Sequence, residues 1–298
     1  MFVEVFFMRE IKYNTDMADE RVDEYKIINN MNEIDGIEII QNEYEEFKVT
    51  EVNVTNENGA TAISKEIGKY ITFELDNIKY IENEDRVIEV LKKYIKELLE
   101  KEKSVLIVGL GNMYITPDAL GSKVVKSTEI TRHLIKLAKN LVEPGTREVS
   151  AISPGVMGTT GIQTSEIVSA VAEIVNPGYI IVIDSLMSKS IKRVGASIQL
   201  SNTGITPGSG LSKINEKIDE KSTDSKVISI GVPMVVDMAT IANDALNKME
   251  NLSDEKNERY QKIAEILDTE NYIVTPKDID ELIDIMSGII SKSINLSM

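Results

Sequence analysis

The chain has 298 residues, 42% of them hydrophobic, which is enough to bury the core of one large α/β domain or two smaller ones. It contains no cysteine and one histidine, His133, which excludes disulfides and a cysteine nucleophile and leaves little room for a histidine triad or a multi-histidine zinc site. A formal net charge of −16 argues against a nucleic-acid partner, and no apolar run approaches the roughly 20 residues of a membrane helix, so we expect no membrane partner either.

The first hundred residues predict a peripheral arm, two strands and a helix. Residues 1–45 are polar and strongly charged after an apolar start, MFVEVFFM, which lacks the features of a signal peptide. FKVTEVNVTN and KYITFELDN alternate apolar and polar residues on either side of the turn-like ENGATAISKEIG, which is typical of a β-hairpin or meander. In RVIEVLKKYIKELLEKEK the apolar residues recur at helical spacing. We therefore expect the arm outside the core and the helix against it.

From residue 101 onward, short apolar strands alternate with amphipathic helices. Strands are predicted at VLIVGL, REVSAIS, YIIVIDSL and KVISIGVPMVV, and helices at TEITRHLIKLAKNLV, SEIVSAVAEIV, MATIANDALNKM and TPKDIDELIDIMSGIISKSI, the last capped by its threonine with proline in the first position. This alternation predicts an α/β fold with a mostly parallel sheet and helices on both faces. SIQLSNTGITPGSG and SKINEKIDEKSTDSK, near 195–225, predict a loop or insertion.

The segment VLIVGLGNMYITPDALG begins like a nucleotide-binding strand–loop–helix unit. Gly109 and Gly111 fit a dinucleotide fingerprint, but Tyr114 stands at the third glycine position and no Gly-Lys-Ser/Thr ending follows, so a phosphate loop is only weakly indicated. Thr116 is predicted as a helix cap, which places Asp118 at the second helical position. That carboxylate is either a partner of the helix dipole or a functional group.

A second carboxylate, Asp184, is the first charged residue after the apolar run of YIIVIDSL, so we expect it at the carboxyl end of that strand. Ligands of open α/β sheets bind at this edge, although an aspartate that merely caps the following turn fits equally well. If the two strands are neighbours, Asp118 and Asp184 face one crevice. Such a pair shares a proton and can supply a general base and a general acid for peptide hydrolysis without a metal.

Two further features are candidates for substrate binding. Gly155, Gly158 and Gly161 lie in a loop that could present backbone N–H groups to an oxyanion, or could simply connect a strand tightly to a helix. Arg193 belongs to a basic cluster that could receive an acidic substrate side chain, or form a solvated helix face. His133 lies within a predicted helix, and we expect it to be structural.

Seven segments that together cover most of residues 48–280 form a characteristic set: VLIVGLGNMYITPDALG, TRHL, SAISPGVMGTTGIQTSEI, IDSLMSKSIKRV, IQLSNTGITPGSG, ISIGVPMVVDMATI and VTPKDID. In these segments the chain resembles the spore germination proteases of spore-forming Firmicutes. The resemblance implies a cytoplasmic endopeptidase of the forespore or spore core that degrades small acid-soluble spore proteins during germination. It also implies a homotetramer, a core similar to hydrogenase maturation endopeptidases with a smaller β-rich insertion or subdomain, and an atypical aspartic protease.

The resemblance assigns the two essential aspartates to Asp118 and Asp184, although the second motif has IDSL where the family has VDAL. It further implies a zymogen that trims its own N-terminus in a Thr-acidic-apolar-Ala context, which NTDMADE supplies. We therefore expect cleavage between Asp16 and Met17, and an arm that is a pseudo-substrate rather than a disordered tail. The predicted organisation is a propeptide at 1–16, an N-terminal arm, meander and helix at 17–100, and the catalytic core at 101–298, with an insertion near 195–225.

Two other interpretations stay open. One is a metal-dependent maturation-type endopeptidase that uses the same carboxylates; His133 does not match the metal-binding histidine of those enzymes, so we expect no metal and no cofactor. The other is a non-catalytic α/β module that binds a nucleotide or a peptide.

Overall fold

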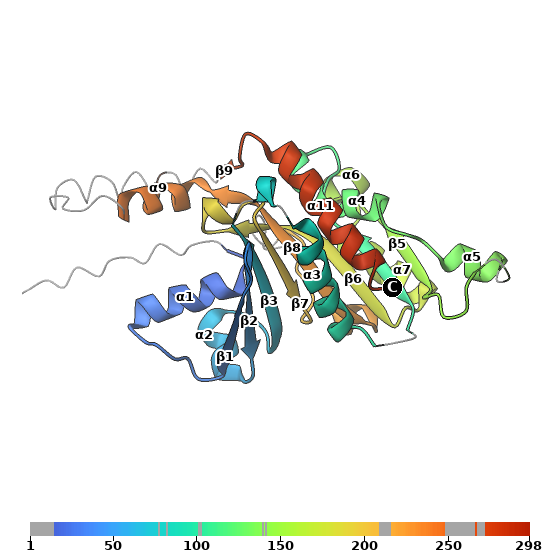
Figure 1. The fold of residues 1–298 in the computed structure, drawn as a ribbon, viewed down its shortest axis with the longest axis horizontal. Coiled ribbons are helices and arrows are strands. Elements are labelled where there is room, and N and C mark those ends of the chain that lie inside the picture. The colour runs from blue at the N-terminus through green and yellow to red at the C-terminus, as the bar shows by residue number, and fades with distance from the viewer. Residues whose placement is uncertain are drawn as a thin grey trace, which may run out of the picture.

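The structure is a computed structural model, which describes residues 15–76, 78–81, 83–100, 103–138, 140, 142–208, 216–247, 266 and 272–298, with the backbone alone at 80 and 243–247. Within these ranges nine strands form one sheet in the order β1-β2-β3-β7-β8-β6-β4-β5, and β9 pairs with β8 (Figure 1). The strands are β1 (Ile37–Glu43), β2 (Phe47–Val54), β3 (Gly68–Leu75), β4 (Val105–Gly109), β5 (Val149–Ile152), β6 (Tyr179–Ser188), β7 (Ser197–Ser201), β8 (Lys226–Asp237) and β9 (Ile273–Val274).

Helices connect the strands and cover the sheet. The α-helices are α1 (Ala18–Asn29), α2 (Glu57–Ile63), α3 (Glu84–Leu98), α4 (Leu120–Lys126), α5 (Arg132–Leu137), α6 (Met157–Thr160), α7 (Thr164–Val175), α8 (Glu220–Thr223), α9 (Met238–Asn247) and α11 (Ile279–Asn295). The 3₁₀ turns whose bounds lie within the described residues are η1 (Ile78–Tyr80), η2 (Thr116–Asp118) and η4 (Ile191–Arg193). Among the described residues, no helix is both long and apolar enough to cross a membrane.

The predicted α/β class is confirmed by the half of the sheet formed by β5, β4, β6 and β8, whose neighbours all pair in parallel. Every residue of β4 is buried, as expected for a parallel strand covered on both faces. On one face Ile107 and Ile181 join α3, α4 and α11 in one hydrophobic cluster. On the other face Leu106 and Val108 pack with Val168 of α7. Helices therefore lie on both faces, as predicted.

The other half of the sheet, β1, β2, β3 and β7, is antiparallel and continues into the parallel half through β7 and β8. The predicted hairpin is present, with α2 where a turn was expected. The prediction of a loop at 195–225 is wrong for Ser197–Ser201, because β7 lies inside the sheet. Ile198 and Leu200 enter the core, whereas Ser197, Gln199 and Ser201 are buried polar residues that concealed the strand.

Two predicted helices are shorter than their patterns suggested. Among the described residues of TEITRHLIKLAKNLV, the α-helix covers Arg132–Leu137, where Leu134 and Leu137 are exposed and supply little packing energy. The last helix begins at Ile279 rather than beside Thr275, since Thr275 instead donates its hydroxyl to the carbonyl of Met234.

The charged N-terminal arm is not wholly peripheral. Residues 1–14 lie outside the described part of the chain, but Met17 and Ala18 have no exposed surface and Val22 is 1% exposed. Ala18 and Val22 pack with Val52 and Tyr70 in a separate cluster between α1 and the antiparallel strands. The expectation of an arm outside the core is therefore wrong for this segment, which leads directly to the candidate site.

Candidate active site

The two-glycine turn after β4 serves to seat Asp118. Gly111 has a φ of +95°, and a Cβ built there would lie 2.0 Å from the main-chain oxygen of Asp118 and 2.8 Å from its Oδ1. The N–H of Asn112 donates to Asp118 Oδ2 at 2.7 Å. Asp118 is the third residue of η2, whose N-cap is Ile115, so the predicted second position of a helix capped by Thr116 is corrected. The glycines hold a carboxylate close to the turn.

The apolar run predicted that Asp184 ends its strand, and this prediction is wrong. β6 continues to Ser188, and Asp184 pairs with Gly231 of β8. The neighbouring strand β4 does end here, with Gly109 paired to Ile183, so Asp184 lies just beyond the carboxyl end of β4. It is 5% exposed, and its Oδ1 accepts the N–H of Ser185 at 2.9 Å.

Both carboxylates line one cavity of about 370 Å³, together with Asp16 and the apolar residues Leu186 and Met187. Burial raises the pKa of Asp184 well above its ordinary value, and the negative charges of Asp118 and Asp16 raise it further. Burial also raises the pKa of Asp118, but the hydrogen bond from the backbone opposes this increase. The two acids are therefore in different electrostatic environments, with the proton favoured on Asp184.

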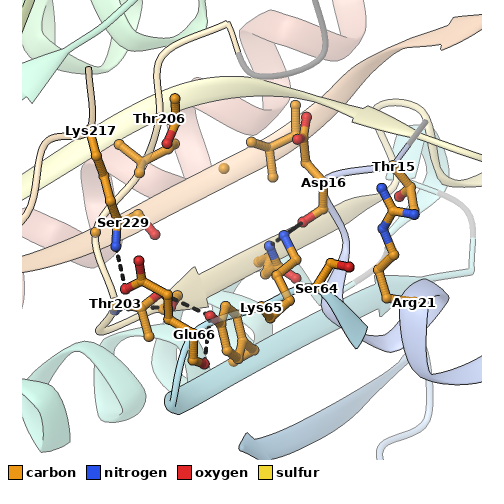
Figure 2. A pocket seen from close by; sticks show the side chains of 17 residues that line it. Thr15, Asp16, Arg21, Ser64, Lys65, Glu66, Thr203, Thr206, Lys217 and Ser229 are labelled. Carbon is orange, nitrogen blue, oxygen red and sulfur yellow. Dashed lines mark hydrogen bonds and ion pairs between the residues drawn. The ribbon is translucent and has the colours of Figure 1, made fainter. Parts of the chain in front are cut away.

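The predicted cleavage site lies at this cavity. The N–H of Asp16 donates to the carbonyl of Met187 at 2.9 Å, and the N–H of Met187 donates back to Asp16 Oδ2 at 2.8 Å. The main-chain oxygen of Asp16 points the other way, toward a second cavity of about 340 Å³, where Lys65 Nζ donates to it at 2.7 Å and Gln199 Nε2 at 3.1 Å (Figure 2). The chain thus holds Asp16 at both its carboxylate and its carbonyl group.

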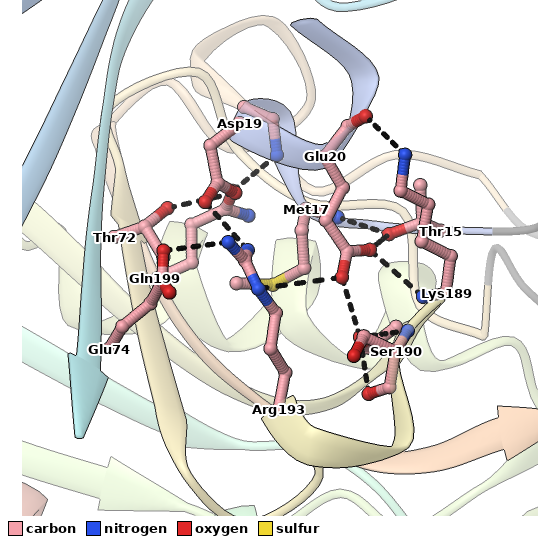
Figure 3. A network of polar contacts seen from close by, with 12 residues as sticks. Thr15, Met17, Asp19, Glu20, Thr72, Glu74, Lys189, Ser190, Arg193 and Gln199 are labelled. Carbon is pink, nitrogen blue, oxygen red and sulfur yellow. Dashed lines mark hydrogen bonds and ion pairs between the residues drawn. The ribbon is translucent and has the colours of Figure 1, made fainter. Parts of the chain in front are cut away.

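The residues that follow the predicted cut are held by Arg193 and β6 (Figure 3). Arg193 donates to Asp19 Oδ2 at 2.6 Å and to Glu74 Oε1 at 2.6 Å, and its Nε lies 3.6 Å from Glu20 Oε1. Glu20 also accepts the Ser188 hydroxyl at 2.8 Å. Burial raises the pKa of Glu20, against the opposing effect of these donors. Arg193 therefore binds acidic groups, as one sequence hypothesis held, but they belong to α1 and a neighbouring strand of this chain.

The loop that contains the three glycines does not line the cavity of Asp118 and Asp184. Gly155, Gly158 and Gly161 follow β5, and none of them is among the described residues that line the cavity of Asp118 and Asp184. A Cβ at Gly158 or Gly161 would contact nothing within 4 Å. The loop connects β5 to α7, which was the simpler of the two interpretations.

The prediction that no metal or cofactor is needed stays a prediction. In the described ranges, no group of three or more histidine, aspartate or glutamate side chains is placed to hold a metal ion, and His133 is an exposed residue of α5. Asp118 and Asp184 alone give two carboxylates, whereas catalytic zinc sites have three protein ligands.

Three groups around the site were missed at the level of sequence. Lys65 follows α2, Gln199 lies on β7, and the backbone of Met187 lies where the pairing of β6 with β8 is irregular. Lys65 lies in no motif, and Gln199 lies within IQLSNTGITPGSG without a role assigned to it there, so only the contact with Asp16 identifies these two side chains.

A half-buried and a buried carboxylate, whose pKa values are raised to different extents, line one cavity together with a segment of the chain, and such a pair is suited to peptide hydrolysis. A family model described as germination protease matches residues 13–253, and the chain belongs to that family. Germination proteases of Clostridium perfringens and Clostridium tetani are each 41% identical, covering 95% of this chain and 94% of theirs. The one from Caldanaerobacter subterraneus is also 41% identical, covering 95% and 93%. A [NiFe] hydrogenase maturation protease, HycI from Thermococcus kodakarensis, is structurally similar with a TM-score of 0.31 at 17% identity, covering 64% of this chain and 99% of its own.

Proposed function

We propose that the chain is an endopeptidase that degrades small acid-soluble spore proteins during spore germination, using Asp118 and Asp184 to activate water. The observation that carries the proposal is the cavity that these two carboxylates share with Asp16. Membership of the germination protease family supports the substrate class. We further propose that the chain forms a homotetramer and acts in the cytoplasm of the forespore or spore core, as the sequence resemblance implies.

The roles of the two acids follow from their surroundings. Asp118, which accepts a backbone N–H, is the ionised partner and takes a proton from the attacking water. Asp184, whose pKa is raised by burial and by its neighbours' charges, holds the proton that the leaving amine receives. Water adds to the carbonyl carbon, and the C–N bond breaks with that proton transfer. The products are one carboxyl group and one amine, and no cofactor is consumed.

The zymogen is part of the same proposal. Residues 1–16 are a propeptide, and the enzyme cuts its own chain between Asp16 and Met17. The placement of Asp16 in the carboxylate cavity, with Met17 fully buried beside it, supports a segment bound as a substrate rather than a loose tail. Substrates with an acidic residue followed by an apolar one would bind in the same way.

The decisive experiment is incubation of the purified chain with a small acid-soluble spore protein, followed by mass spectrometry of the fragments. The unaltered chain should cut after acidic residues that precede an apolar residue, and Asp118→Asn and Asp184→Asn should each be inert. Cleavage by both variants would exclude the paired-aspartate mechanism. Activity retained after exhaustive chelation would exclude the metal-dependent alternative.

The self-processing site is tested separately. Asp16→Ala should block or displace the cut, because the carboxylate that accepts the N–H of Met187 is lost. An unchanged new terminus at Met17 in this variant would refute the assigned site.

A further inference from the structure

We propose that Lys65 and Gln199 are the oxyanion-binding residues of this enzyme, holding the carbonyl oxygen of the peptide bond that the aspartate pair cleaves. The inference rests on the proposed function, in which the bond after Asp16 is the first to be cut. The ammonium of Lys65 donates to the main-chain oxygen of Asp16 at 2.7 Å, and the amide of Gln199 donates to the same oxygen at 3.1 Å. Two donors that converge on one carbonyl oxygen are the arrangement that stabilises a tetrahedral intermediate.

The two donors come from separate parts of the fold and are held in place before any reaction. Lys65 follows the left-handed C-cap residue of α2, and Gln199 lies on β7 inside the sheet. The side-chain oxygen of Gln199 accepts the N–H of Ala18 at 2.7 Å. This bond fixes the orientation of the amide, so that its NH₂ group faces the oxygen of Asp16. The side chain of Gln199 therefore contacts the main chain on both sides of the bond between Asp16 and Met17.

The electrostatics of Lys65 call for an anionic partner. Although the chain carries a net charge of −16, Lys65 forms no salt bridge with any described residue. Burial lowers the pKa of its ammonium, and the charge of Asp16 only partly offsets this effect. Lys65 is half-buried, and a cation whose contacts include a neutral carbonyl and the ring of Tyr70, with its centroid 5.9 Å away, is only partly compensated. It becomes well compensated when that oxygen gains negative charge, because a hydrogen bond between two ions is roughly twice as strong as a neutral one.

The position of Asp16 between two cavities allows the chemistry. It lines the cavity of the aspartate pair and also the cavity that contains Lys65 and Gln199. Water activated by the aspartates adds to the carbonyl carbon, and the π electron pair moves onto the oxygen held by Lys65 and Gln199. When the intermediate collapses, the electron pair on that oxygen re-forms the C=O bond, and the carbonyl group becomes part of the new carboxyl group. The nitrogen of Met17 leaves with a proton from the acidic member of the pair.

The test is the first-order rate of cleavage between Asp16 and Met17 in the purified full-length chain, followed by intact-mass spectrometry. Lys65→Met should slow this cleavage by about 10²–10³-fold, the cost of removing one oxyanion donor. Lys65→Arg should recover part of the rate, because the guanidinium keeps the positive charge and the donors. Lys69→Met is the matched control: Lys69 pairs with Glu51 at 2.6 Å, and its loss should leave the rate unchanged.

Hydrogen exchange distinguishes catalysis from simple anchoring of the N-terminal segment. In a chain kept uncut by Asp184→Asn, Lys65→Met should leave the protection of the amides of Asp16 and Ala18 within a few-fold of its parent. The inference is overturned if that protection falls in proportion to the rate, if Lys65→Met cleaves like the unaltered chain, or if the unaltered chain makes no cut at this bond. Cleavage by the Asp184→Asn chain at the unaltered rate would instead overturn the proposed function.

Discussion

Replacing Gly111 with alanine should damage the site through Asp118, and the size of the effect follows from the geometry. At a φ of +95° an L-residue is strained by roughly 1–2 kcal/mol. The new Cβ would lie 2.0 Å from the main-chain oxygen of Asp118, and relieving such overpacking costs about 1–3 kcal/mol more. Together these terms lower the free energy of unfolding by about 2–5 kcal/mol. A displacement of about 1 Å in the carboxylate reduces the cleavage rate roughly 10²-fold.

Gly145→Ala is a close control for this prediction. Gly145 has nearly the same φ, +92°, but a Cβ there would meet no atom within 4 Å. Its replacement should therefore cost only the backbone strain of roughly 1–2 kcal/mol and leave the cleavage rate unchanged. The assay is the initial rate on a small acid-soluble spore protein, corrected for the folded fraction from a melting curve. Full activity in Gly111→Ala, or an equal loss of activity in Gly145→Ala, would refute the assignment of the turn to Asp118.

Three further outcomes are expected. The rate of cleavage should be bell-shaped in pH: it falls in acid as Asp118 is protonated and in alkali as Asp184 loses its proton, and an alkaline limb in the ordinary carboxyl range would contradict the raised pKa of Asp184. Asp184→Asn should be more stable than the unaltered chain at neutral pH. The raised folded pKa contributes stability below the ordinary value of 3.8 that is lost as pH rises through the folded pKa, so the advantage should vanish in melting curves below pH 3.8. Arg193→Met should lower stability by about 3–5 kcal/mol, as for a broken buried ion network, and speed hydrogen exchange in α1. The exposed neighbour Lys192, changed to methionine, should do neither.

The parallel half of the fold could be predicted because its strands are apolar on both faces and are separated by amphipathic helices. The same logic placed Asp118 and Asp184 at one edge of the sheet, and both line one cavity. β7 escaped prediction because three of its five residues are polar. One of them, Gln199, is buried against the N-terminal segment, and a contact so distant in sequence leaves no local periodicity to recognise.

The surroundings of the acids were harder to foresee for the same reason. Lys65 and Gln199 lie 49 and 183 residues from Asp16, and nothing in the sequence around either residue indicates a contact with Asp16. Arg193 was recognised as a possible receptor for acidic groups, but only the fold identifies Asp19 and Glu20 as groups that it binds. A single sequence shows which residues could act as acids, bases or ion-pair partners. Which distant residues come into contact is decided by the topology of the sheet, which the local sequence does not show.

The complete burial of Met17 makes the proposed self-cleavage a one-way step. Its N–H now donates to the hydroxyl of Thr15, a bond that suits a neutral amide. Cutting the chain converts this amide into a charged ammonium, and converts the carbonyl group of Asp16 into a carboxylate. Lys65 is a partner for the new carboxylate, but the new ammonium of Met17 is costly at a buried position where the neutral amide met only a hydroxyl group. The proposed cleavage is therefore hard to reverse, because re-forming the bond needs the charged terminus of Met17 to return, without its proton, to a fully buried position.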